Sequence, residues 1–243
     1  TTYIQGVGLG TLTDALAAVK YHVFDKHNVE MNELTAALAA NFEDNEQLRL
    51  LLENQSPRYG CDDDYADMIA VELFNIYYDL LNGRPNTKGG QYRVNLLPTT
   101  VHIYFGEVTG ALPHGRRAGV PLSEGISPSQ GTDSHGPTSV TKSAAKIDHA
   151  RTGGTLLNMK LNPQLLEGAG LDKLTHLIRG YFKLDGHHIQ FNVIDKETLL
   201  AAQNKPAEYK HLIVRVAGYS DYFINLGADL QNEIIARTEM TQI

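Results

Sequence analysis

The stretch Val214-Arg215-Val216-Ala217-Gly218-Tyr219-Ser220-Asp221-Tyr222-Phe223 is the most informative part of the 243-residue chain. Its apolar beginning, residues 212–216, predicts a short buried strand that delivers Gly218. Glycine accepts backbone conformations closed to other residues, so this pattern alone indicates a tight turn between the strand and the aromatic residues that follow. Residues 226–237 carry apolar side chains at helical spacing and predict a closing helix.

The segments before this turn alternate between strand and helix patterns. We expect strands over residues 155–161 and 187–194, and helices over residues 138–149, 165–182 and 196–203. Strands that alternate with helices favour a parallel arrangement. The predicted fold class is therefore α/β.

The first third of the chain is helical in pattern. One helix is expected over residues 10–24, with Thr11 or Thr13 as its N-cap. Another helix is expected to begin at Asp62-Asp63-Asp64, where the carboxylates would interact favourably with the helix dipole, and to end at Gly83. Two shorter helices are expected over residues 31–42 and 46–52.

The middle of the chain holds one expected strand and one long loop. Residues 101–105 are apolar and partly β-branched, which predicts a strand. Residues 106–137 are dense in Gly, Pro, Ser and Asp without sustained periodicity. We expect an ordered loop there, and long loops in compact domains are often functional.

Composition excludes several classes of protein. The net charge of −7 argues against nucleic-acid binding, and no apolar run approaches the roughly 18 residues of a membrane span. A single cysteine, Cys61, excludes an internal disulfide framework and favours a reducing, cytoplasmic setting. The chain opens on an apolar, glycine-rich segment without Met, which indicates a processed or truncated chain.

Two weaker motifs are set aside. Gly6-Val7-Gly8-Leu9-Gly10 is not the G-x-G-x-x-G fingerprint, and no clear strand precedes it. His187 and His188 are neighbours on a predicted strand, so they face opposite sides and cannot hold one metal ion. We expect no metal site.

The C-terminal motifs resemble those of glycyl radical enzymes, which carry an Arg-Val-x-Gly-Tyr pattern near their C-terminus. Arg215 to Tyr219 match this pattern, an aromatic residue follows, and residues 231–239 resemble the family's last helix. The resemblance covers essentially the whole chain. Its upstream part includes Gly115-Arg116-Arg117, Gly125-Ile126-Ser127-Pro128 and Thr152-Gly153-Gly154-Thr155-Leu156-Leu157-Asn158.

The resemblance implies that Gly218 stores a radical on its Cα. Such a radical is stabilised when the carbon flattens between an electron-donating amide nitrogen and an electron-withdrawing carbonyl, and a side chain would clash in that geometry. No bound cofactor is implied, because a radical S-adenosylmethionine activating enzyme installs the radical. The resemblance assigns the radical loop to Arg215, Val216, Ala217, Tyr219 and Ser220 around Gly218.

The family's fold implies how this chain is organised. It would form the C-terminal part of a ten-stranded α/β barrel, with residues 1–184 in the barrel and residues 185–243 as the glycyl radical domain. In the family the radical passes to a cysteine followed closely by a glutamate. Cys61 has neither the spacing nor the glutamate, so the catalytic cysteine is expected on a missing N-terminal portion of the same enzyme. Such enzymes are commonly homodimers.

The ending Tyr219-Ser220-Asp221-Tyr222-Phe223 resembles the dehydratase branch of the family, with trans-4-hydroxyproline, glycerol or propanediol as the small-molecule substrate. In that branch the stretch that includes Thr99 lines the substrate cavity. Thr99 would offer its hydroxyl to the substrate, although a threonine chosen for strand propensity remains the alternative. Three other functions stay open: a pyruvate formate-lyase type of acetyltransferase, a radical-bearing spare part, and a non-enzymatic binding domain.

We predict that Cys61→Ala leaves hydrogen abstraction unaffected in the full-length enzyme. The reason is that Cys61 lacks both the spacing and the glutamate partner of the family's thiyl-forming residue. Turnover per radical, measured after anaerobic activation, checks the prediction. A complete loss of turnover with normal folding and normal radical content would overturn it.

Overall fold

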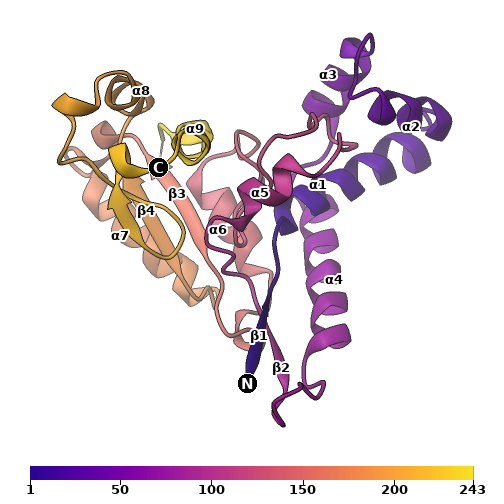
Figure 1. Cartoon of the computed structure of the whole chain (residues 1–243), viewed down its shortest axis with the longest axis horizontal. Helices are drawn as coiled ribbons and strands as arrows, with labels where there is room; N and C mark the ends of the chain where they lie inside the picture. Colours follow the sequence, from indigo (N-terminus) through magenta and orange to yellow (C-terminus); the bar gives the residue numbers. More distant parts are fainter. Residues whose placement is uncertain (243) are drawn as a thin grey trace.

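The computed structural model describes residues 1–242 and has a mixed α/β architecture. Two arms diverge from a shared base in Figure 1: one holds α1 to α3, and the other holds the larger sheet with α7, α8 and α9. The nine α-helices of the described part are α1 Leu9–Val19, α2 Met31–Ala39, α3 Glu46–Gln55, α4 Asp64–Leu81, α5 Val101–Glu107, α6 Pro137–Ala145, α7 Gly170–Lys183, α8 Lys196–Asn204 and α9 Ala228–Ala236.

Three small sheets complete the fold. Strand β1 (Thr2–Gln5) pairs with β2 (Tyr92–Asn95) in parallel, and β3 (Leu157–Leu161) lies between β4 (Ile189–Val193) and the short β7 (Glu239–Met240), again in parallel. A parallel bridge between Leu96 and Thr155 connects the end of β2 to the start of β3. The expected parallel arrangement is therefore confirmed. The third sheet is an antiparallel hairpin of β5 (Ile213–Arg215) and β6 (Ser220–Tyr222).

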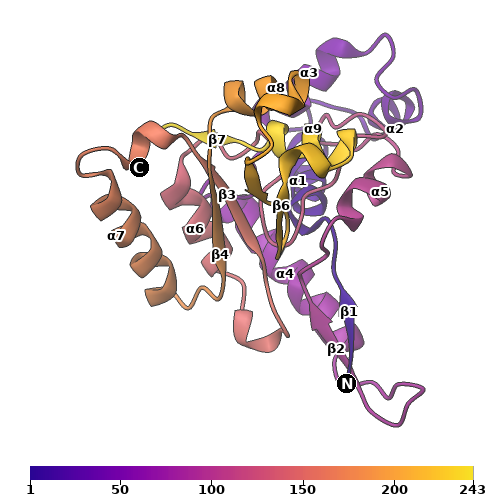
Figure 2. The same cartoon turned by 60° about the vertical axis from the view of Figure 1, so that its left-hand side comes forward.

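The central strand β3 is buried along its whole length. Its residues Leu157, Met159 and Leu161 pack in an apolar core to which α4, α6 and α7 contribute. The strand's other side chains, Asn158 and Lys160, are also buried but polar. Side chains alternate along a strand, so the sheet has one apolar face and one polar face. Figure 2 shows β4, β3 and β7 side by side.

The acidic start predicted for the long helix α4 is confirmed. Asp63 is the N-cap, and its side chain accepts a hydrogen bond of 2.9 Å from Tyr65 N. Asp64 and Asp67 stand in the first turn, where carboxylates interact favourably with the helix dipole. The helix packs against α1 and contributes Phe74 to the core.

The N-cap predicted for α1 was wrong. The helix begins at Leu9 with Gly8 as the N-cap, and it continues as a π-helix over Lys20–Asp25. Thr11 and Thr13 lie inside the helix and are buried. Thr13 Oγ1 donates to Leu9 O at 2.8 Å, which satisfies its hydroxyl without any capping role.

The strand predicted over residues 101–105 is also wrong, because this segment is the helix α5. Its buried residues, His102 and Gly106, are four apart and share one helical face. The backbone carbonyl of His102 accepts from Leu122 N at 3.1 Å. Periodicity alone cannot assign a short apolar run to a helix or a strand. In this segment tertiary contacts stabilise the helix.

The long loop that was predicted between α5 and α6 is confirmed and is held by internal bonds. The guanidinium of Arg116 donates to the carbonyl of Gly110 at 2.7 Å and to that of Gly106 at 2.9 Å. Further along, Ile126 N donates to Leu156 O at 2.9 Å, so the loop lies against the chain that enters β3. At this contact Gly125 has φ +52° and lies close to the Leu156 carbonyl.

The C-terminal part has an apolar core of its own. Residues of α8, the β5–β6 hairpin and α9 meet there, among them Leu199, Val214, Phe223 and Ile234. Strand β4 follows residue 185 yet pairs with β3, which precedes it. The division into residues 1–184 and 185–243 stays a prediction.

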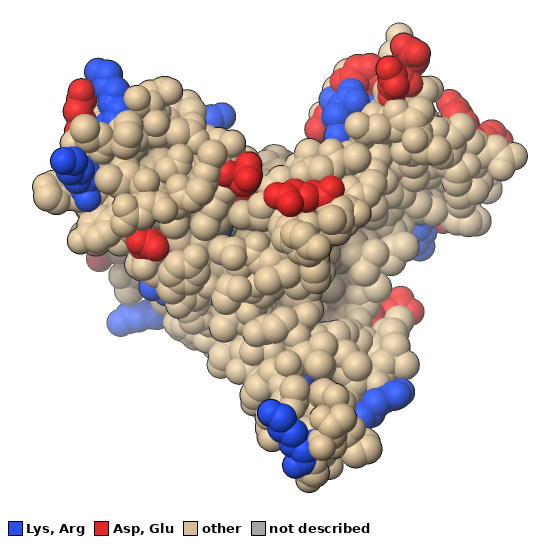
Figure 3. Space-filling model, in the orientation of Figure 1, with Lys and Arg blue, Asp and Glu red and all other residues tan. Residues whose placement is uncertain are grey.

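Charged side chains are dispersed in the view of Figure 3, mostly toward the edges, with no concentration of Lys and Arg on that face. Among residues 1–242, no helix has the length and the apolar character needed to cross a membrane.

We predict that Gly125→Ala destabilises the protein more than Gly131→Ala. Both glycines have positive φ, at +52° and +80°, so either alanine strains the backbone by about 1 kcal/mol. A Cβ on Gly125 would also lie 2.2 Å from Leu156 O, whereas nothing lies within 4 Å of one on Gly131. Relieving that overlap should cost about 1–3 kcal/mol more. Thermal unfolding of both variants measures the difference, and equal losses would contradict the close approach.

Candidate functional site

Gly218 stands at the tip of the β5–β6 hairpin. Arg215 pairs with Ser220 at the last register position, and Val216 N donates to Tyr219 O at 2.9 Å. The turn between them is formed by Ala217 and Gly218. Gly218 is exposed and Ala217 is fully buried, so one side of the turn is anchored in the core while its tip is open.

The backbone conformation at position 218 explains why the residue there is a glycine. Its φ of +83° is left-handed, a region that costs other residues about 1–2 kcal/mol. Space is not the limit, because a Cβ at this position would meet only Leu97, at 3.5 Å from its Cδ1. An alanine therefore fits the folded chain at a modest cost in strain.

The Arg215 side chain ties the hairpin to the sheet. Its Nη2 and Nε donate to Gln190 Oε1 at 2.8 and 3.1 Å, and its Nη1 donates to Ser220 Oγ at 3.0 Å. Gln190 is buried on β4 and in turn donates to the side chain of Asn158 on β3. One guanidinium thus joins both strands of the hairpin to β4 and, through Gln190, to β3.

Asn192 holds the backbone of the same residue. Its Oδ1 accepts from Arg215 N at 2.7 Å, and its Nδ2 donates to Arg215 O at 2.8 Å. The side-chain amide therefore makes the paired bonds that a neighbouring strand would make. Asn192 and Gln190 are two residues apart on β4, so both project from the same face of the sheet.

A buried ion pair at the C-terminal end of α9 also binds the hairpin. Arg237 Nη2 lies 2.8 Å from Glu233 Oε2 and 2.9 Å from the carbonyl oxygen of Val216. Burial would raise the pKa of Glu233, but the charge of Arg237 holds it well below its usual range. Burial raises the pKa of the neighbouring Glu124, and the charge of Arg237 only partly opposes this.

Thr99 lies on the loop that faces the hairpin. It is exposed, has φ +54°, and its Oγ1 donates to Pro98 O at 2.7 Å. It precedes the helix α5 and is not a strand residue, so strand propensity does not explain it. Leu97, two residues earlier, is the side chain nearest to Gly218. The structure thus brings together the segments of Thr99 and Gly218, the two residues chosen from the sequence.

The other residues of the predicted radical loop have distinct surroundings. Val216 is buried in the C-terminal core, and Ser220 bonds to Arg215. Tyr219 is half exposed at the tip, and partial burial followed by the charge of Asp221 raises the pKa of its phenol.

Cys61 is not part of this arrangement. It precedes α4, and Figure 1 places α4 on the side of the molecule away from the hairpin. Its Sγ donates to Thr132 O at 3.6 Å, and burial raises the pKa of the thiol. A raised thiol pKa disfavours the reactive thiolate.

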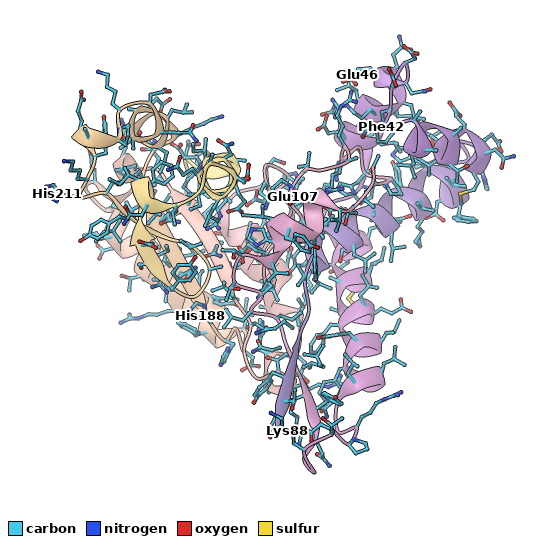
Figure 4. The ribbon with its side chains drawn as sticks, in the orientation of Figure 1. Phe42, Glu46, Lys88, Glu107, His188 and His211 are labelled. Carbon is cyan, nitrogen blue, oxygen red and sulfur yellow. The ribbon has the colours of Figure 1, made fainter. Side chains whose placement is uncertain are left out.

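The described residues include no group of three or more His, Cys, Asp or Glu side chains that could hold a metal ion. His188, labelled in Figure 4, directly precedes β4. Burial lowers its pKa, and the nearby charge of Arg215 lowers it further, which favours a neutral ring.

No role was predicted from the sequence for Gln190, Asn192, Glu233 and Arg237. The first two carried a readable signal, because they are polar residues two apart in a predicted strand and therefore share one face. The sequence signal for the Glu233–Arg237 ion pair was weaker, because oppositely charged residues at i, i+4 also occur on exposed helix faces.

Two family models match the chain. The model described as "Glycine radical" matches residues 122–224, which include Gly218, and the model described as "Pyruvate formate lyase-like" matches residues 1–106. The chain is 59% identical to a trans-4-hydroxy-L-proline dehydratase of Clostridioides difficile over 99% of its own length and 31% of the relative's.

Solved structures agree with these matches. The crystal structure of hydroxyproline dehydratase from Clostridioides difficile, with trans-4-hydroxy-L-proline bound, superposes with a TM-score of 0.95 at 59% identity, over 98% of this chain and 30% of that one. The glycerol-bound, B12-independent glycerol dehydratase from Clostridium butyricum gives 0.94 at 46% identity, over the same shares. The chain thus spans about 30% of the length of these relatives, and it belongs to the glycyl radical enzyme family.

Proposed function

We propose that Gly218 stores a carbon-centred radical and that the chain is the C-terminal portion of a radical dehydratase. The observation that carries the proposal is the position of Gly218 at an exposed hairpin tip, within the glycine radical match. Side-chain hydrogen bonds from β4 and α9 hold the strand that leads to it. In this arrangement hydrogen bonds fix the residues that precede Gly218, while the Cα–H of Gly218 itself stays available for reaction.

A second protein would activate the chain. A radical S-adenosylmethionine activating enzyme would remove one hydrogen atom from the Gly218 Cα. The carbon would then flatten between the amide nitrogen of Gly218 and its own carbonyl. Leu97 is the side chain in contact range of this position, so it would shield the flattened carbon on one side.

The strand order supports a place for the chain in a barrel. Strands β1 and β2 run parallel, the Leu96–Thr155 bridge continues the order to β3, and β4 follows in parallel. We assign these strands to part of the ten-stranded barrel of the family. Residues 185–243, with their separate apolar core, would be the radical domain.

The reaction proposed for the complete enzyme is loss of water from a small hydroxylated substrate. A thiyl radical on the remaining part of the enzyme takes a hydrogen atom from a carbon of the substrate. For a vicinal diol such as glycerol, a carboxylate base accepts the proton of the hydroxyl on that carbon and passes it to the hydroxyl on the neighbouring carbon, which leaves as water. For trans-4-hydroxyproline, which has one ring hydroxyl, the hydrogen atom would come from the carbon between the ring nitrogen and the hydroxyl-bearing carbon, and the hydroxyl would leave as water with a proton that the base moves from the ring nitrogen. The thiol then returns its hydrogen atom to the product radical. The named relatives act on trans-4-hydroxy-L-proline and glycerol, which supports such substrates here.

Thr99 is our candidate for a substrate contact. Thr99 is an exposed residue, and Leu97 places its loop against the Gly218 hairpin. In this structure the hydroxyl donates to the Pro98 carbonyl, a bond that a polar substrate group could replace.

A second candidate function is formate C-acetyltransferase. The match of residues 1–106 to the pyruvate formate lyase-like model favours it. Formation of acetyl-CoA from pyruvate by the full-length enzyme, with no dehydration of hydroxyproline, glycerol or propane-1,2-diol, would select this function.

We predict that Gly218→Ala abolishes the radical and leaves the fold intact. The alanine Cβ would prevent flattening of the Cα, yet it meets only Leu97 at an ordinary contact distance. Electron paramagnetic resonance after anaerobic activation measures the radical, and circular dichroism checks the fold. Gly227→Ala is the control, because nothing lies within 4 Å of a Cβ there. A paramagnetic resonance signal in Gly218→Ala equal to that of the parent would contradict the assignment of the radical to Gly218.

We predict that Thr99→Val lowers kcat/KM about ten-fold or more, since a lost hydrogen bond to a polar substrate costs about 1–3 kcal/mol. Valine keeps the β-branched shape, so the strain at φ +54° is unchanged. Assays use hydroxyproline, glycerol and propane-1,2-diol at equal radical content. Thr100→Val is the matched control, because Thr100 caps α5 without any side-chain hydrogen bond. An unchanged kcat/KM for every accepted substrate would remove Thr99 from the site.

A further inference from the structure

The guanidinium of Arg237 binds two consecutive carbonyls of the strand that leads to Gly218. Its Nη2 donates to Val216 O at 2.9 Å and its Nη1 to Arg215 O at 3.4 Å. Arg237 follows the last residue of α9 and is only 8% exposed. The bond to Val216 fixes a peptide group two residues before Gly218, and Arg237 shares the Arg215 carbonyl with Asn192.

Glu233 orients this guanidinium. Both carboxylate oxygens accept from Arg237 Nε, at 3.0 and 3.2 Å, and Oε2 also accepts from Nη2 at 2.8 Å. This planar fork uses several of the five N–H groups of arginine at once. A lysine would bring the same charge but a single ammonium group, which could not satisfy Glu233 and both carbonyls in this geometry.

The same carboxylate reaches the loop that carries Thr99. His102 Nε2 on α5 lies 3.5 Å from Glu233 Oε1, and Gln130 Nε2 donates to that oxygen at 3.1 Å. His102 is three residues after Thr99 and is fully buried. A continuous set of polar contacts therefore runs from α5 through Glu233 and Arg237 to the Val216 carbonyl.

We propose that Arg237 is a positioning residue that, oriented by Glu233, holds the Gly218 hairpin at a fixed place relative to α5 and the Thr99 loop. The inference rests on the proposed radical role of Gly218. Hydrogen bonds are directional, so this pair sets where the Cα of Gly218 lies. Transfer of the radical depends on that position, and small displacements of reacting groups lower rates strongly.

The test uses the full-length enzyme with two variants. Arg237→Lys keeps the charge and removes the fork. The double variant Glu233→Leu with Arg237→Met removes both members of the ion pair, so neither Glu233 nor Arg237 is left buried without its partner. Arg49→Lys is the matched control, because Arg49 also pairs with a glutamate at i, i+4, but with one that is half exposed, on α3.

After anaerobic activation, spins per protomer, kcat per radical, KM and the thermal midpoint are measured. We expect both variants to form the Gly218 radical and to fold, with kcat per radical at least ten-fold lower, KM within two-fold of the parent, and Arg49→Lys unchanged. A kcat per radical equal to that of the parent in both variants would overturn the positioning role while leaving Gly218 assigned. A parent enzyme with no glycyl signal would instead overturn the proposed function, and this inference with it.

Discussion

Side-chain alternation along β3 and β4 is the constraint on which the rest of the molecule depends. Strand β3 is buried along its whole length, and the residues of both strands point in turn to opposite faces. Leu157, Met159 and Leu161 of β3 face the helices and form the main core. Their neighbours on the strand must face the other way, and there the residues are Asn158 and Lys160. One strand thus provides a dry apolar face and a polar face in the same protein interior.

The polar face dictates what can cover it. A buried amide or ammonium group without a partner costs several kcal/mol, so the elements above this face must supply hydrogen bonds. Lys160 Nζ donates to the Ile235 carbonyl in the last turn of α9 at 2.8 Å, where a cation also suits the helix dipole. Lys160 is only 1% exposed, and this burial lowers its pKa to about 8. On β4, Gln190 and Asn192 continue the polar face and bind Arg215.

These facts explain how much the sequence could predict. The parallel strands, the long loop and the turn at Gly218 follow from apolar runs and from glycine and proline, which act locally. The helix α5 was mistaken for a strand because a short, mostly apolar run suits either structure, and the shared burial of His102 and Gly106, four residues apart, is what identifies the helical face. The partners of Val216 and Arg215 were missed for a different reason. Arg237 and Asn192 meet the hairpin from about 20 residues away on either side, and no local pattern reports such contacts.

The nature of the contacts around Gly218 fits the task proposed for it. An apolar contact tolerates sliding, because its energy varies slowly with direction. A hydrogen bond weakens steeply when its angle departs from linearity, so it fixes a position. Asn192 binds both backbone groups of Arg215, and Arg237 binds the carbonyl of the next residue. Three consecutive peptide groups before the radical position are thereby held by side chains from β4 and from the C-terminal end of α9. At Gly218 itself, a Cβ would come into contact range of the apolar side chain of Leu97, at 3.5 Å from its Cδ1, so the side chain beside the glycine makes no directional bond there.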